Sequence, residues 1–144
     1  MTSETMTSET TSGRTGRAAP IWPTFLYRDA PAAIDFLQRA FGFVEVARYG
    51  SGEVVDHAEL AWPGGGGIML GSVREGAALC KQAPGSGSVY LVVDDPDARY
   101  ERARAAGATI EVELRDEDYG SRGFTCRDPE GVFWSFGTYA GAAG

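Results

Sequence analysis

Apolar and polar residues follow one another along this chain in an order that occurs twice. An apolar segment at 21–28 leads through Asp29 into a helical pattern that ends at Gly42. The same order returns at a constant offset, with Asp94 and Gly107 in the corresponding places (94 − 29 = 65, 107 − 42 = 65). Aspartate caps helices and glycine ends them, so these residues mark element boundaries. The pattern therefore predicts a duplicated strand–helix unit.

The remaining segments complete each unit with three strands. In the first unit we expect a helix between Asp29 and Gly42 and strands at 21–28, 43–49, 53–62 and 68–73. In the second unit we expect a helix at 96–106 and strands at 88–94, 109–114, 121–127 and 132–139. The polar segment 74–87 is expected to be a linker without regular structure. The sequence thus predicts an α+β fold of two βαβββ units, at about 21–73 and 88–140, in one domain covering 21–140.

Composition changes this picture only at the start of the chain. Residues 1–20 are mostly polar and contain the pentapeptide Met-Thr-Ser-Glu-Thr twice, so we expect a disordered tail. This tail has no apolar core of the kind that a secretory signal needs. No window approaches 18 apolar residues, so no membrane span is predicted. Cys80 and Cys126 are too few for a disulfide framework, and a cytoplasmic location is expected.

The charge of the chain bears on its partners. The formal net charge is −7, and Lys81 is its single lysine. A nucleic-acid partner is not expected, because phosphate contacts need a basic face. An acidic protein attracts cationic small molecules more readily than anionic ones.

Several motifs carry a resemblance to a known superfamily. They are Tyr119-Gly-Ser-Arg122, His57-Ala-Glu-Leu60, the segment 27–42, and Asp128-Pro-Glu-Gly followed by Val-Phe-Trp-Ser-Phe. Together with the duplication, they resemble the vicinal oxygen chelate superfamily of glyoxalases, bleomycin-resistance proteins and extradiol dioxygenases. The closer similarity is to the bleomycin-resistance-type branch. The resemblance implies two four-stranded mixed sheets that curl around a cavity, commonly completed by dimerisation, so a homodimer is expected.

The resemblance also identifies where a metal would bind. Enzymes of this superfamily take metal ligands from the first and fourth strands of each unit. The corresponding positions here hold Trp22 or Pro23, Leu70 or Met69, Ser88, and Ser135. None of these side chains is a histidine or carboxylate, the usual ligands of such an ion. We therefore expect neither a metal nor another cofactor.

Other side chains are candidates for contact with a ligand. His57 and Glu59 share one face of a strand by two-residue alternation. Two interpretations are open: the two side chains orient a ligand together, or the histidine is hydrogen-bonded on the sheet surface. Tyr119 and Arg122 belong to a motif that borders the ligand cavity in the resembled branch. The alternative for Arg122 is an ion pair with the acidic loop at 116–118.

Aromatic side chains complete the candidate site. Trp22, in a metal-ligand position, and Trp134 are possible stacking surfaces for a flat or cationic ligand, with core packing as the alternative. The predicted ligand-binding set is Trp22, His57, Glu59, Ser88, Tyr119, Arg122, Trp134 and Ser135.

Three functions remain open on this basis. The first is a metal-free protein that binds a small molecule, aromatic or cationic, as drug-sequestering members do. The second is a glyoxalase-like lyase or dioxygenase that uses a divalent metal. The third is a metal-independent biosynthetic enzyme that uses His57, Arg122 or Tyr119.

Overall fold

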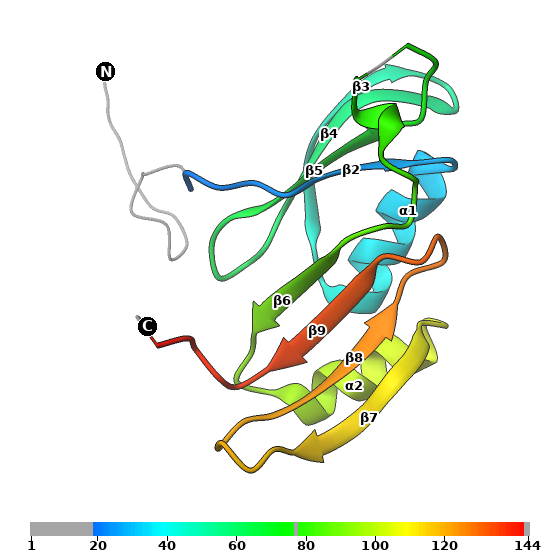
Figure 1. Ribbon diagram of the computed structural model, residues 1–144. Coiled ribbons are helices and arrows are strands. Elements are labelled where there is room, and N and C mark those ends of the chain that lie inside the picture. Colours follow the sequence, from blue (N-terminus) through cyan, green and yellow to red (C-terminus); the bar gives the residue numbers. More distant parts are fainter. Residues whose placement is uncertain (1–18, 77, 143–144) are drawn as a thin grey trace.

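The computed structural model describes residues 19–76 and 78–142. It contains two βαβββ units that follow one another along the chain (Figure 1). The predicted α+β fold with two four-stranded mixed sheets is confirmed. Most of the tail predicted at 1–20 lies outside the described residues.

The first unit forms the first sheet, in the order β2-β5-β4-β3. Strands β2 and β5 are parallel, and the other neighbours are antiparallel. Its elements are β2 (Thr24–Tyr27), α1 (Ala30–Phe36), the π-helical turn η2 (Leu37–Phe41), β3 (Val44–Ser51), β4 (Val54–Ala61) and β5 (Gly67–Ser72).

The second unit repeats this arrangement in the order β6-β9-β8-β7, again with one parallel pair, β6 and β9. Its elements are β6 (Ser88–Val92), α2 (Pro96–Ala105), β7 (Thr109–Asp116), β8 (Arg122–Arg127) and β9 (Phe133–Gly137). The predicted linker contains one short 3₁₀ turn, η3 (Ala78–Lys81), where no regular structure was expected.

Local chemistry explains the boundaries of the first helix. The Asp29 carboxylate accepts a hydrogen bond from the backbone N–H of Ala32 at 3.1 Å, as predicted for an N-cap. Gly42 ends the helical segment with φ +92°, a left-handed conformation that glycine adopts without strain. The first strand is shorter than predicted. Pro23 lies just before it, and proline has no N–H to donate to a ladder.

One hydrophobic core joins the two units. The ring of Phe41, at the end of the first helical segment, lies 5.3 Å from that of Trp134 and 5.1 Å from that of Phe136, both in β9. Arg102 of α2 donates to the backbone oxygens of Arg39 and Gln38. In Figure 1 the first unit lies above the second, with α1 near their junction.

Candidate functional site

Each sheet buries one face against the helices and leaves the other open. Strand pairing defines the open face of the second sheet: Ser88 pairs with Phe133 and Tyr90 with Ser135, which in turn pairs with Thr125. The alternate residues, Leu91, Phe124, Trp134 and Phe136 among them, are buried in the core. Side chains alternate between the faces of a strand, so the polar and tyrosine side chains lie together on the open side.

A cavity of about 170 Å³ occupies this open face. At its base the hydroxyls of Thr125 and Ser135 lie 2.8 Å apart and share a hydrogen bond. Its lining residues are Tyr90, Val112, Glu117, Tyr119, Ser121, Gly123, Phe124, Thr125, Ser135, Phe136 and Gly137. The cavity therefore combines hydroxyl groups with aromatic walls.

Tyrosines from distant parts of the chain meet at the edge of this cavity. The Tyr90 hydroxyl donates to the backbone oxygen of Tyr139 at 2.7 Å, and the Tyr139 N–H donates to the Ser121 hydroxyl at 3.1 Å. The ring of Tyr119 meets that of Tyr139 edge-on, with centroids 5.9 Å apart. Tyr119 nevertheless remains 65% exposed, so its ring is available to a ligand.

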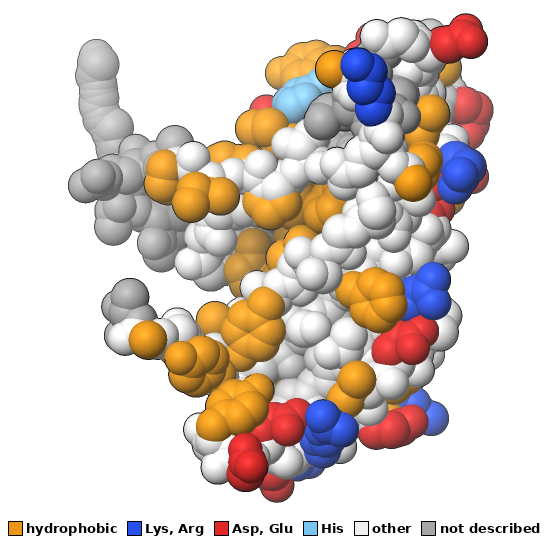
Figure 2. All heavy atoms as spheres, in the orientation of Figure 1, with side chains coloured by type: hydrophobic (Ala, Val, Ile, Leu, Met, Phe, Trp, Pro, Cys, Tyr) orange, Lys and Arg blue, Asp and Glu red, His pale blue; other side chains and the backbone are white. Residues whose placement is uncertain are grey.

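Two larger cavities, of about 520 and 540 Å³, lie beside Trp62 and share Gly64 and Val92 as walls. The larger one also borders on Tyr90, which lines the 170 Å³ cavity as well. Figure 2 shows hydrophobic side chains gathered along β6 towards the C-terminus. Tyr90 is therefore a common wall of the small polar cavity and a larger, more apolar one.

His57 and Glu59 lie on the open face of the first sheet. His57 Nε2 and Glu59 Oε2 are 2.9 Å apart, and the ring of Tyr49 stacks on the imidazole with centroids 6.2 Å apart. Glu59 pairs across β4 and β5 with Met69, while the neighbouring Leu70 is buried in the core. The structure brings the predicted His57–Glu59 pair together, on a different sheet from Ser88, Tyr119 and Ser135.

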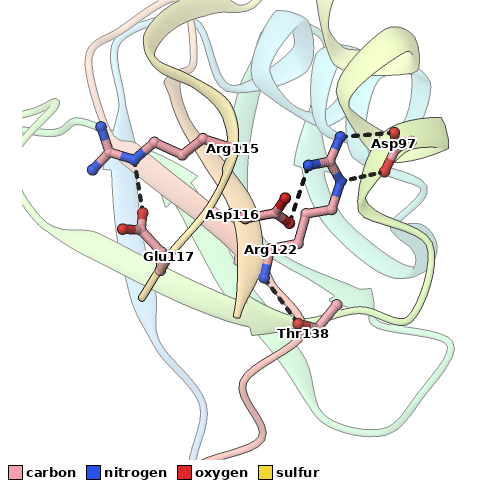
Figure 3. Close-up of polar contacts among 6 residues, drawn as sticks. All are labelled: Asp97, Arg115, Asp116, Glu117, Arg122 and Thr138. Atoms are coloured by element: carbon pink, nitrogen blue, oxygen red, sulfur yellow. Dashed lines mark hydrogen bonds and ion pairs between the residues drawn. The ribbon is translucent and has the colours of Figure 1, made fainter. Parts of the chain in front are cut away.

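Arg122 points away from the open face (Figure 3). Its guanidinium donates to both carboxylate oxygens of Asp97, at 2.9 and 3.1 Å, and to Asp116 at 3.2 Å. These bonds hold the pKa of Asp97 below its ordinary value and raise that of Arg122. Of the two alternatives for Arg122, the geometry supports the ion pair, with Asp97 as a partner that the sequence did not suggest.

The two predicted tryptophans lie in different surroundings. Trp134 is fully buried and donates from Nε1 to Asp128 at 3.0 Å, so it packs in the core and presents no surface to a ligand. Trp22 is partly buried, and its Nε1 donates to the backbone oxygen of Ala19. Its ring lies against Gly67, beside the larger apolar cavity.

The positions that correspond to metal ligands do not fit a divalent ion. They present an indole or proline ring (Trp22, Pro23), a thioether or buried alkyl group (Met69, Leu70), and the neutral hydroxyls of Ser88 and Ser135. Within residues 19–76 and 78–142 no three histidine, cysteine or acidic side chains come together as a metal site would require.

Cys126 is buried in the core of the second sheet. Burial raises the pKa of its thiol to about 12, with the nearby Asp128 as a smaller cause. A thiol with so high a pKa stays protonated at neutral pH and is a poor nucleophile. Its burial and protonated thiol indicate a structural role for Cys126. The side chain of Cys80 lies outside the described residues.

Sequence reasoning missed Tyr90, Thr125 and the glycines at 123 and 137. Alternation from Ser88 would have placed Tyr90 on the same face. Thr125 carried no comparable signal, because its contact with Ser135 depends on the register between β8 and β9.

Comparison with known proteins agrees with this architecture. Residues 21–136 match the model of the glyoxalase/bleomycin resistance protein/dioxygenase superfamily. An uncharacterised protein of Mycobacterium bovis is 34% identical over 121 residues, 80% of each chain. The crystal structure of TioX from Micromonospora sp. ML1 matches with a TM-score of 0.72 and 31% identity, over 83% of this chain and 98% of that one.

A glyoxalase/bleomycin resistance protein from Streptomyces sp. CB03234 shares the fold at 23% identity, with a TM-score of 0.60 over 78% of this chain and 94% of that one. No helix in the described part of the chain is long and apolar enough to cross a membrane. The family match covers both units and both sheets. The chain therefore belongs to the glyoxalase/bleomycin resistance protein/dioxygenase superfamily.

Proposed function

We propose that this protein binds a small molecule without a metal and holds it on the open face of the second sheet. The observation that carries the proposal is the cavity built on the Thr125–Ser135 hydroxyl pair. Ser135 stands where a metal enzyme of this superfamily would need a ligand, and here it offers a neutral hydrogen-bonding group to a bound molecule.

The ligand is aromatic or cationic. Tyr90 and Tyr119 provide ring surfaces, which stack on flat molecules and attract cations. The net charge of −7 disfavours the approach of an anionic ligand. Sequestration of an antibiotic, with one part of the molecule held in this cavity, is the corresponding biological role.

The active form is a homodimer. Large apolar side chains are exposed on β3 and β4 and on β6, including Val46 at 58%, Val54 at 54% and Val92 at 48%. Exposed apolar groups of this kind favour burial against a partner. Light scattering after size-exclusion chromatography should therefore give twice the chain mass of 15.3 kDa; the mass of a monomer would contradict this part of the proposal.

A panel of aromatic and cationic natural products tests the binding function. At least one compound should raise the melting temperature and bind without being converted, as measured by calorimetry and mass spectrometry. Tyr119→Ala should weaken binding of that compound by about two- to ten-fold, because stacking on an aromatic ring contributes about 0.5–1.5 kcal/mol. Arg122→Gln is the matched control and should leave the affinity within two-fold. Turnover, or one tightly held metal ion per purified chain, would contradict the proposal.

A metal-independent enzyme is the second candidate, and the 2.9 Å contact between His57 and Glu59 favours it. A histidine oriented by a carboxylate can act as a general base. Loss of turnover in His57→Ala with unchanged ligand affinity would support this candidate over the binding protein.

A further inference from the structure

The 170 Å³ cavity has features that select one class of chemical group. From them we propose that it binds an uncharged aromatic ring carrying a hydroxyl or carbonyl group, which bonds to Thr125 and Ser135. This inference rests on the proposed binding function and names the part of the ligand that the cavity holds.

The size of the cavity indicates a single ring. Pockets that hold a whole drug-sized ligand have volumes of about 300–1,000 Å³, whereas this one measures about 170 Å³. An apolar cavity of about 150 Å³ takes up benzene. The cavity therefore accommodates one substituted six-membered ring, with the rest of a larger ligand outside it.

Two facing glycines leave part of the cavity wall without side chains. Gly123 and Gly137 are partners in β8 and β9. A Cβ on Gly137 would lie 2.7 Å from the Tyr90 hydroxyl oxygen, and one on Gly123 would lie 2.1 Å from the backbone oxygen of Phe136. Neither position admits a side chain in this geometry. At Gly123 the backbone of the neighbouring strand approaches this closely, and at Gly137 the Tyr90 hydroxyl does, so the wall of the cavity depends on glycine at both positions.

The hydroxyl pair supplies the polar anchor. Two hydroxyls have two protons to donate, and the contact between Thr125 and Ser135 uses only one. The pair can therefore donate one hydrogen bond to the ligand and also accept from it. Both side chains are only partly buried, so a hydroxyl or carbonyl oxygen on the ring reaches them.

The charges around the cavity exclude a carboxylate on the ring. Glu117 is the single charged residue among those lining the cavity, and its carboxylate accepts a hydrogen bond from Arg115 at 2.8 Å (Figure 3). Arg115 is thus committed to Glu117. A carboxylate placed in the cavity would lose its water without gaining a free cation, which is costly.

The neighbouring region suits the rest of the ligand. Tyr90 separates the small cavity from the cavity of about 540 Å³, whose walls include Pro23, Phe43, Trp62 and Ile68. A molecule with a hydroxylated ring at one end and an apolar body would occupy both.

Three probe compounds distinguish these features in fluorine NMR titrations of the full-length chain: 4-fluorophenol, fluorobenzene and 4-fluorobenzoate. We expect 4-fluorophenol to bind about five-fold more tightly than fluorobenzene, the effect of one net hydrogen bond. We expect 4-fluorobenzoate to bind at least ten-fold more weakly than 4-fluorophenol. Equal binding of the benzoate and the phenol, or no binding of 4-fluorophenol at 10 mM, would overturn the inference.

Variants locate the binding. Thr125→Val combined with Ser135→Ala removes both hydroxyls and should abolish the preference for 4-fluorophenol over fluorobenzene. Thr24→Val, which removes an exposed hydroxyl from the first strand of the other sheet, should keep this preference. A preference that survives the removal of both hydroxyls would contradict the inference.

A filling variant separates this inference from the proposed function. Ser135→Leu should block the binding of 4-fluorophenol, because the leucine side chain fills the cavity. The thermal unfolding transition should stay cooperative, because that side chain extends into open space. If a natural product from the panel binds this variant with unchanged affinity, the proposed ring site is contradicted, whereas the proposed small-molecule-binding function is retained. If neither the panel nor the probes bind the native chain, both proposals fail.

Discussion

Asp128 links the two units at the scale of a single residue. One carboxylate oxygen accepts hydrogen bonds from the backbone N–H groups of residues 130–132. The other accepts from the Tyr27 hydroxyl at 2.6 Å and from Trp134 Nε1 at 3.0 Å. Asp128 is only 4% exposed, so these partners replace the water that its carboxylate has lost. Burial raises the pKa of the Tyr27 phenol, and the nearby Asp128 carboxylate raises it further, so Tyr27 remains a neutral donor.

Replacing this carboxylate should be costly. Asp128→Ala leaves several buried donors without an acceptor, so we expect the free energy of unfolding in urea to fall by about 3 kcal/mol. Tyr27→Phe should cost about 1 kcal/mol, since it removes one hydrogen bond. Asp94→Ala removes an exposed carboxylate just before α2 and is the control. It should change the free energy of unfolding by less than about 0.5 kcal/mol. Equal effects of Asp128→Ala and Asp94→Ala would contradict this role.

Cys126 should remain unreactive in the folded protein. In a Cys80→Ser background, a thiol reagent at pH 8 should label Cys126 only after urea unfolds the chain, because its pKa is about 12. Rapid labelling of the native protein would contradict the buried position.

The same pKa predicts a loss of stability at alkaline pH. Above about pH 8.5 the unfolded thiol ionises, whereas the folded thiol stays protonated until about pH 12. The unfolded state then binds fewer protons, so the free energy of unfolding falls as pH rises through this range. Urea titrations should show a smaller alkaline loss in Cys126→Ala than in the native chain; equal losses would argue against the shifted pKa.

At the scale of elements, the duplication extends to the ends of the helical segments. Gly42 and Gly107 follow the first and second helical segments with φ of +92° and +95°. Their surroundings differ. A Cβ on Gly42 would lie 3.1 Å from Arg99 and 3.2 Å from Arg102, whereas a Cβ on Gly107 would meet no atom within 4 Å. The two helical segments end with the same backbone geometry, but of these two glycines only Gly42 lies against side chains of α2.

This difference predicts unequal effects of equivalent substitutions. Gly107→Ala should lower the free energy of unfolding by about 1 kcal/mol through its left-handed backbone alone. Gly42→Ala should cost more, because Arg99 and Arg102 must also move. Thermal and urea unfolding of the two variants compare them directly. A larger loss for Gly107→Ala would contradict the packing at Gly42.

On the scale of the whole molecule, the two units depend on each other. Phe41 of the first unit packs against two core rings of the second. The Glu130 carboxylate accepts hydrogen bonds from the backbone N–H groups of Arg28 and Asp29, at 2.7 and 2.8 Å. Because each sheet covers its core partly with residues from the other unit, neither has a complete core alone.

The isolated second unit, residues 88–140, should therefore fail to fold. Its two-dimensional NMR spectrum should show the narrow dispersion of an unfolded chain, since Trp134 and Phe136 would be exposed. In the full chain, Phe41→Ala should cost about 3–5 kcal/mol in urea unfolding, the usual loss for a buried phenylalanine. A well-dispersed spectrum from the isolated unit would contradict this interdependence.

The predictable part of this protein is the part encoded locally. Asp29 caps the first helix, and Gly42 and Gly107 end the two helical segments, each by acting on residues next to it in the chain. The order of strands and helices could therefore be predicted to within a few residues at each end. The Asp128-Pro-Glu-Gly motif is local as well, and it lies between the predicted strands at 121–127 and 132–139. The absence of histidines and carboxylates at Trp22, Ser88 and Ser135 followed from the sequence once the strands were aligned.

The candidate site depends on contacts that no local pattern records. Ser135 meets Thr125 through the register of β8 and β9, and Tyr139 reaches Tyr90 across 49 positions of the chain. Arg122 was predicted near the ligand or in an ion pair with the acidic loop; it bonds to Asp116 of that loop, and the packing of α2 adds Asp97 as a second partner. By itself the sequence determined the duplicated fold and the missing metal ligands, because both follow from residue type and spacing. Only the tertiary structure decided which side chains share the cavity, because strand register and helix packing bring together residues far apart in the chain.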